Sequence, residues 1–423
     1  MSDSKTFSPN GIEGINIVVR TFDGAEIDIT ENVLSFSIFE SIFSPFLFGE
    51  LYVMDNSAML STLPWIGQEE VIFQWERNEE TVEKVFRTTG VENVIPQKDN
   101  RATYRIGITS EAQIKNASSL LSKSYTLSAS EIIDTIYSEF ISDDLLVNVN
   151  VDTAHNVVFP YIKPFQAINT ILKTCLADDQ TPMFLFDRFY EQDQSVVLTS
   201  YARMFDQESI VDFSPIKVIN NIAEQDQPVE AHQVYTYNVM KAFKTLEQIS
   251  DGAYSSTQRT LDISNKSSDI DSDFYFKDLA KNVGNEWIKE TFLFDKSVSR
   301  RVNKLQDSFA FDNGFSNIYD IDNLDSLILK SFMNRFSSFV INASINPIAY
   351  TVRSGIPFTV GKTVDFTVPT FMPVSNSLKY DNLKNKPLSG KYLITSIRHQ
   401  MTGSEYTMSI ELSRDYLGEE TVL

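Results

Sequence analysis

Apolar residues alternate with polar ones in short runs near both ends of the chain, and this pattern constrains the fold most. In the run 405–413, Tyr406, Met408, Ile410 and Leu412 alternate with polar residues. A spacing of two places these four side chains on one face of a strand, so the runs predict half-buried strands. The 31 phenylalanines and 17 tyrosines in 423 residues also favour strands.

The first 112 residues contain several such runs and read as a compact all-β unit. A turn at Asp23-Gly24 joins the first two runs, and Ser44-Pro45 separates the third from the fourth. These residue types are typical of turns between strands. Strands are expected at residues 14–22, 25–30, 34–42, 48–55, 71–76 and 103–110.

After about residue 113 the apolar period changes to that of helices. Ser128 and Glu131 have the spacing of a capping box, and apolar residues follow at helical spacing up to Ile141. A second helix is expected to begin at Pro164, because proline suits the first helical turn. This part of the chain therefore reads as α+β. A hairpin is expected from the runs 183–189 and 194–201, and further helices are expected at 274–289 and 325–336.

The two β-rich ends of the chain repeat the same order of features. Residues 64–67 (PWIG) precede Val71 and Phe73, and residues 357–361 (PFTVG) precede Val364 and Phe366. In each case a strand near a glycine, a turn and a closing alternating strand follow. The repeated order predicts an internal duplication of the β unit. Strands of the second copy are expected at 232–243, 364–369, 390–401 and 405–413.

The charge and cysteine content exclude several classes of protein. The formal net charge is −21 and the pI is about 4.6, and no basic stripe of the kind that grips phosphates is present. A single cysteine, Cys175, excludes an intrachain disulfide. No apolar run approaches the roughly 20 residues of a membrane span, and the polar N-terminus lacks a signal core. We therefore expect a protein made and folded in a reducing cytoplasm, without a membrane span.

The residues that usually carry chemistry form no recognisable site. The three histidines, His155, His232 and His399, lie in separate units and share no metal-ligand spacing with Cys175. His399 is in phase with the apolar side of its strand, so we expect a packing role, and Cys175 is expected in a helix core. The sequence has no GxSxG, GxGxxG or GxxxxGK[ST] motif. We expect no catalytic residue, no metal and no cofactor, and hence not an enzyme.

The aspartates of residues 269–273 (DIDSD) open like a calcium-binding loop. Phe274 stands where such a loop needs glycine, and Ala280 stands where it needs glutamate. We therefore expect a solvated acidic loop.

The stretch 38–55 (IFESIFSPFLFGELYVMD) is unusually apolar for an acidic chain. Phe36 and Ile38 before the turn, and Leu51 and Val53 after it, fit alternating strands with a buried face. The residues around the turn do not alternate, and a proline there cannot donate to a central ladder. An exposed apolar tip marks an interaction surface; the alternative is a tip that folds back onto its own domain. The subunit-interface candidates, called the apolar tip below, are Ile42, Phe43, Pro45, Phe46, Leu47 and Phe48.

The order of these parts resembles the baseplate hub protein of contractile-tailed bacteriophages and the related late-control-like proteins. Three segments carry the likeness: 34–57 (LSFSIFESIFSPFLFGELYVMDNS), 164–187 (PFQAINTILKTCLADDQTPMFLFD) and 390–414 (GKYLITSIRHQMTGSEYTMSIELSR). None is a strict signature, and their order and spacing carry the resemblance.

The resemblance implies a mainly β fold with an α+β insertion: two tube-type β-barrel domains per chain and a helix-containing outer domain. It implies a homotrimeric ring with pseudo-sixfold symmetry that joins the hexameric tail tube to the trimeric spike. Wedge proteins of the baseplate are further implied partners, and DNA passes through the lumen without specific binding during genome ejection. Such a protein is located in the virion, at the tail baseplate.

The resemblance also sets the expected domain boundaries. The first barrel is expected at 1–112, and the second at 216–255 and 338–415. The insertion is expected at 113–215 and 256–337, followed by a tail at 416–423. Two other functions stay open: a receptor- or glycan-binding tail protein, and a cell-wall hydrolase that uses an acidic pair.

Overall fold

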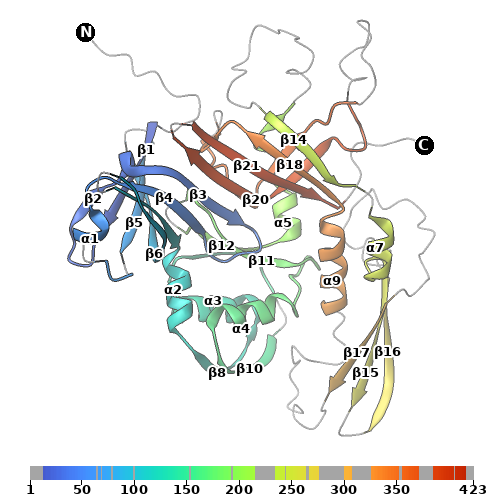
Figure 1. The fold of residues 1–423 in the computed structure, drawn as a ribbon. Helices are drawn as coiled ribbons and strands as arrows, with labels where there is room; N and C mark the ends of the chain where they lie inside the picture. The colour runs from blue at the N-terminus through green and yellow to red at the C-terminus, as the bar shows by residue number, and fades with distance from the viewer. Residues whose placement is uncertain are drawn as a thin grey trace, which may run out of the picture.

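The fold is mainly β, as the sequence predicted, and a computed structural model shows its arrangement (Figure 1). The described strands form one large sheet and three small ones, with a few helices below the large sheet. The structure describes residues 13–62, 65–67, 69–77, 80–98, 101–151, 154–191, 194–214, 234–242, 244–262, 266–275, 300–306, 325–351, 355–370, 384–403 and 405–415.

The large sheet combines strands from both ends of the chain. Its neighbours run in the order β14-β18-β21-β20-β3-β4-β7-β6-β5-β1-β2, and β19 pairs with β20 and β13 at one side. The first β unit contains β1 (Glu13–Arg20), β2 (Glu26–Asp28), β3 (Val33–Ser41), β4 (Phe48–Asp55), β5 (Glu70–Arg77), β6 (Glu80–Pro96) and β7 (Ala102–Thr109). The second β unit contains β13 (Asp212–Phe213), β14 (Val234–Lys241), β18 (Phe339–Ile345), β19 (Thr363–Phe366), β20 (Gly390–Thr402) and β21 (Glu405–Arg414).

The same strand order occurs twice in this sheet, which confirms the predicted duplication. The first unit reads β3-β4-β7-β6-β5 and the second reads β14-β18-β21-β20-β19. One backbone hydrogen bond is repeated as well: Thr88 N donates to Glu69 O at 3.0 Å, and Ile394 N donates to Lys362 O at 2.9 Å. The two units are therefore structural copies.

The two units are joined by an antiparallel ladder between β3 and β20. Its register runs from Ser41 opposite Ser396 to Ser35 opposite Thr402. The ladder makes one continuous sheet of both units, so neither strand leaves its backbone groups unpaired along this joint.

The predicted faces of the strands at the apolar stretch are confirmed. Phe36, Ile38, Leu51 and Val53 are buried in one core cluster under the first unit. A second cluster lies under the strands of the second unit and includes residues of helix α9 (Asp325–Phe336), which has the bounds predicted from the sequence. The large sheet is thus covered on the face from which its apolar side chains project.

The predicted α+β insertion has its own core, below the first unit in Figure 1. The capping box is present: the Ser128 side chain accepts from Glu131 N, and the Glu131 side chain accepts from Ser128 N. The predicted hairpin is present as antiparallel β11 and β12. The elements are α2 (Glu111–Ser118), β8 (Leu121–Ser128), α3 (Ala129–Phe140), β9 (Leu145–Asn148), β10 (Ala154–Ile162), α4 (Pro164–Leu172), β11 (Met183–Asp187), β12 (Val196–Ser200) and α5 (Tyr201–Phe205).

The region between residues 250 and 306 differs from the sequence predictions. A three-stranded sheet follows helix α7 (Thr245–Ser250), and the sequence pattern did not predict it. Phe274 lies in β16, which ends at Tyr275, so the helix expected from 274 is wrong at its start. Residues 276–289 lie outside the described residues. The sheet contains β15 (Ser255–Asp262), β16 (Ser267–Tyr275) and β17 (Arg300–Gln306).

The solvated acidic loop expected at 269–273 is also wrong, because these residues belong to β16. Thr257 Oγ1 on the neighbouring strand donates to Asp273 Oδ1 at 2.6 Å. A cross-strand polar pair of this kind stabilises the pairing of β15 with β16.

Two glycines at matching places in the units allow a test of the packing between the second unit and the insertion. Gly67 and Gly361 both have positive φ, 79° and 78°. A Cβ at Gly67 would meet nothing within 4 Å, whereas one at Gly361 would lie 2.5 Å from Phe186 Cζ. We predict that Gly67→Ala costs about 1 kcal/mol from backbone strain.

Gly361→Ala should cost about 1 to 3 kcal/mol more, because Phe186 in the core must move. Thermal unfolding of both variants measures the difference, with Gly67→Ala as the control for strain alone. Equal midpoints for the two variants would contradict the packing described above.

Candidate functional site: the apolar tip and the joint between the units

The turn that carries the apolar tip is tied to both β units by its backbone. Ser44 N donates to Ser41 O at 3.0 Å, which closes the turn after β3. Ile42 N donates to Thr395 O on β20 at 3.0 Å, so the tip extends the ladder between the units. Ser44 Oγ donates to Phe46 O at 2.7 Å. The tip is therefore an ordered turn at the end of the joint.

A buried polar network fixes the far side of the tip to the insertion. Leu47 N donates to Ser110 Oγ at 2.9 Å, and Ser110 Oγ donates to Asp187 Oδ2 at 2.8 Å. Lys84 Nζ lies 3.1 Å from Asp187 Oδ1, and both side chains are buried. A buried carboxylate is tolerated because a cation and hydroxyl donors satisfy it. β6, β7 and the tip thus meet the insertion hairpin at Asp187.

Most of the tip is covered within the chain. Ile42 and Leu47 are buried, in the clusters of the second and the first unit respectively. The ring of Phe46 stacks on Phe165 of α4, with 5.9 Å between centroids. Pro45 is partly buried. Ile42 and Leu47 therefore fit the alternative prediction, in which the tip folds back onto its own chain.

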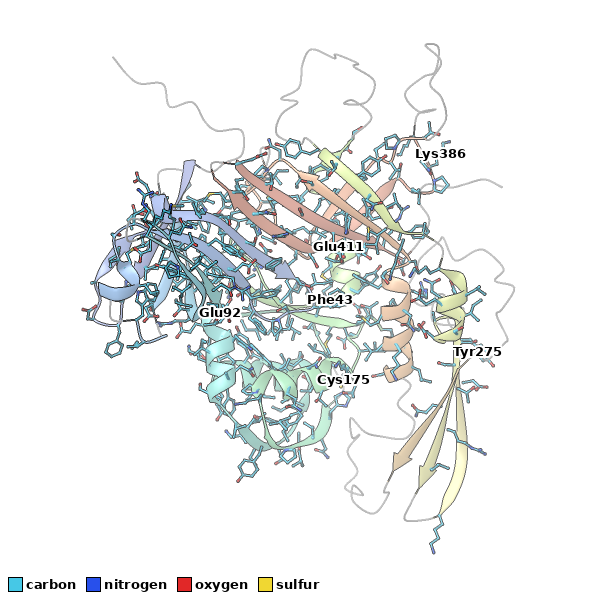
Figure 2. All side chains as sticks on the ribbon, in the orientation of Figure 1. Phe43, Glu92, Cys175, Tyr275, Lys386 and Glu411 are labelled. Carbon is cyan, nitrogen blue, oxygen red and sulfur yellow. The ribbon has the colours of Figure 1, made fainter. Side chains whose placement is uncertain are left out.

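Phe43 and Phe48 keep about half of their surface exposed, at 51% and 45%. Phe43, labelled in Figure 2, meets the rings of Phe184 on β11 and Phe336 on α9 at 5.8 and 5.9 Å. Phe48 stacks on Phe39 of the neighbouring strand at 5.0 Å. Of the six predicted interface residues, Phe43 and Phe48 therefore remain the candidates for a contact with another subunit.

His399 lies in the joint, in a chain of buried polar groups. Its Nε2 lies 2.8 Å from Glu40 Oε1 and its Nδ1 lies 2.9 Å from Tyr406 Oη. Tyr406 Oη in turn lies 2.6 Å from Tyr190 Oη of the insertion. Burial raises the pKa of both tyrosines above the ordinary range, so both are neutral. With no exposed surface, His399 packs three parts of the chain together.

The other candidates for chemistry are separate from one another. His155 is buried on β10, and burial lowers its pKa; His232 lies outside the described residues. Cys175 is buried in the core of the insertion. Within the described ranges, no three His, Cys, Asp or Glu side chains are grouped to hold a metal ion. None of the helices described has the length and apolar character that a membrane crossing needs.

Comparisons with known proteins identify the fold. No protein-family model and no curated protein matches the sequence. Among solved structures, the chain is similar to the tail protein from Neisseria meningitidis MC58, with a TM-score of 0.57 and 9% identity over 95% of this chain and 97% of that one. The chain has the fold of a tail protein.

A second tail protein supports the same assignment of fold. The 43 kDa tail protein of prophage MuSo2 from Shewanella oneidensis has a TM-score of 0.52 and 12% identity over 95% of this chain and 99% of that one. The tail-protein fold thus spans nearly the whole chain, including the insertion.

The environment of Cys175 gives a prediction of reactivity. Burial raises the pKa of its thiol to about 12, so about one thiol in 10⁴ is ionised at pH 8. We predict no reaction with an aromatic disulfide reagent at pH 8 until the protein unfolds, and then one thiol per chain. Ser118→Cys, at the exposed last residue of α2, is the positive control. A rapid reaction of the native wild-type chain would contradict the buried placement.

The exposed rings of the tip give a second prediction. Phe43→Ser and Phe48→Ser should fold normally, because half of each ring already faces solvent. If a neighbouring subunit covers a ring, its loss should cost about 1 kcal/mol per contact, or about fivefold in assembly. Sedimentation over a concentration series measures the effect. Phe22→Ser, at an exposed turn, is the matched control, and wild-type assembly of both tip variants would exclude the subunit contact.

Proposed function

We propose that the protein is the structural hub of a phage tail baseplate, in which three copies form a ring between the tail tube and the spike. The observation that carries the proposal is the strand order repeated within a tail-protein fold. Two copies of one β unit per chain allow three chains to present six similar positions. A ring of this kind can match a hexameric tube on one side and a trimeric spike on the other.

The proposed partners follow from that position. The hub contacts itself, the trimeric spike, the tail tube protein and the wedge proteins of a contractile baseplate. It is assembled in the host cytoplasm and located in the virion, with the two β units as barrels around the lumen and the insertion outside them. We also propose the domain boundaries that the sequence predicted.

The charge supports a role as a conduit for DNA during genome ejection. A net charge of −21 disfavours binding of the phosphate backbone, and a passage should not retain the genome that crosses it. The buried state of His399 and Cys175 supports a structural role without catalysis. Lysis of the cell wall would then be carried out by a partner.

The mass of the particle tests the proposed ring. We predict three times the 48.1 kDa of one chain by light scattering, alone or with the spike bound, and a ring in negative stain. A strictly monomeric particle at micromolar concentration, with and without the spike, would overturn the hub function. Turnover of peptidoglycan by the purified chain would favour the hydrolase instead.

A further inference from the structure

In the joint between the two units, the central strand β20 has both of its edges covered by other strands. β20 pairs with β21 along one edge, from Leu393 to Thr402. Along the other edge it pairs first with β19, at residues 390–393, and then with β3, at residues 396–402. Two strands are therefore needed, one after the other, to cover that second edge of β20.

In the first unit, described strands cover only half of that edge of the equivalent strand β6. β6 pairs with β7 from Arg87 to Pro96, and with β5 from Glu80 to Arg87. In the part of the chain that the structure describes, no strand continues beyond β5 along the edge at residues 88–96. The missing strand is the one that would correspond to β3 in the internal joint.

The structural copy of β3 is β14, and no described strand covers the outer edge of β14. β14 ends the sheet and pairs with β18 alone among the described strands. In the first unit, the same edge of β3 is taken by β20. β14 is the end strand of the sheet, and six strands lie between it and β6, so one chain cannot bring its own two edges together (Figure 1).

Both edges expose apolar side chains. Ile95 on β6 is 59% exposed and Met240 on β14 is 53% exposed, and Val94 and Tyr235 are also among the exposed large apolar residues. Long edges with exposed apolar groups are templates for pairing with another chain unless they are covered. Among the described residues, the features that usually protect an edge are Glu92, Pro96 and a bulge on β6, and Lys241 and a bulge on β14.

The ladders of the two units give the register of such a pair. Glu92 occupies the position of Arg398, because they pair with Arg105 and Ser409 at equivalent points of β7 and β21. Lys241 occupies the position of Phe39, because their partners, Val340 and Phe48, are equivalent. Arg398 faces Phe39 in the internal joint. Glu92 would therefore face Lys241, an opposite charge.

One extra residue in each strand keeps that register continuous. Two residues lie between Glu92 and Ile95 of β6, whereas one residue lies between the two equivalent positions of β20. The extra residue forms a bulge, at which Asn93 has a φ of 54°. Between Val239 and Lys241, β14 has one residue more than β3. The two bulges fall opposite each other, so Val94 would face Val239 and Ile95 would face Asn238.

We propose that residues 91–96 of β6 in one copy pair antiparallel with residues 237–242 of β14 in a second copy of this chain. The proposal rests on the ring assembly above and names the surface that closes it. Three such joints alternate with the three internal joints, so the same ladder geometry occurs six times around the ring. We infer a second copy of this chain as the partner because the equivalent strands already pair within one chain. There, β3, the equivalent of β14, pairs with β20, the equivalent of β6.

Engineered disulfides test the register. In Ile95→Cys with Asn238→Cys, both sites are exposed, and facing residues of an antiparallel ladder lie about 5 Å apart, within reach of a disulfide. Mild oxidation should give covalent dimers and trimers that reduction reverses, with no larger species. The buried Cys175 does not contribute.

The control is Ile95→Cys with Tyr235→Cys, three residues further along β14, or about 10 Å away. It should form at least tenfold less cross-link under the same conditions, and thermal unfolding should show that all variants fold.

The outcomes separate this proposal from the hub function. A trimer by light scattering without a cross-link in the 95/238 variant, or with equal cross-linking in the control, overturns the strand pairing and leaves the hub function standing. A monomeric particle overturns both. A series of cross-linked products with more than three chains supports the strand pairing and overturns a closed ring of three chains.

Discussion

The antiparallel ladder between β3 and β20 is the interaction on which the other parts of the structure depend. It pairs residues 35–41 with residues 396–402, more than 350 positions away in the chain. Backbone groups of a central strand must be paired because burying them unpaired costs free energy. This ladder satisfies both strands and fixes the two β units side by side. The buried contact between His399 and Glu40 lies within it.

The insertion depends on the same joint. Asp187 accepts hydrogen bonds from Ser110 and Ser195 and pairs with Lys84, and Ile42 and Phe46 contact the cores on either side of the turn. These contacts place the insertion against both units at once. The tail-protein fold is therefore organised around the place where its two similar halves meet.

Much of the fold could be predicted from the sequence, because its strands and helices bury apolar faces with regular periods. The capping box at Ser128 and the helix 325–336 depend on neighbouring residues, and both could be recognised. The sheet β15-β16-β17 could not, because the sequences of its strands are rich in polar residues such as Thr257 and Asp273 and show no alternating apolar pattern. Periodicity carries no signal for such a sheet.

The residues that the candidate site residues contact could not be predicted from the sequence. The sequence indicated that Phe43 and Phe46 do not fit a strand, but their contacts with Phe184, Phe336 and Phe165 join segments far apart in the chain. The role of His399 depended on Glu40, which has no special position in the sequence pattern. Tertiary contacts of this kind become visible only when the topology is known.

The matched bulges of β6 and β14 have a consequence for the choice of partner. A strand that lacked its extra residue would slip by one position past the bulge, and every side chain beyond would turn to the opposite face. Val94 would then leave the apolar side of the joint. A related chain with only one of the two bulges would therefore be a poor neighbour, and a cell that makes several such chains could sort them by backbone length alone.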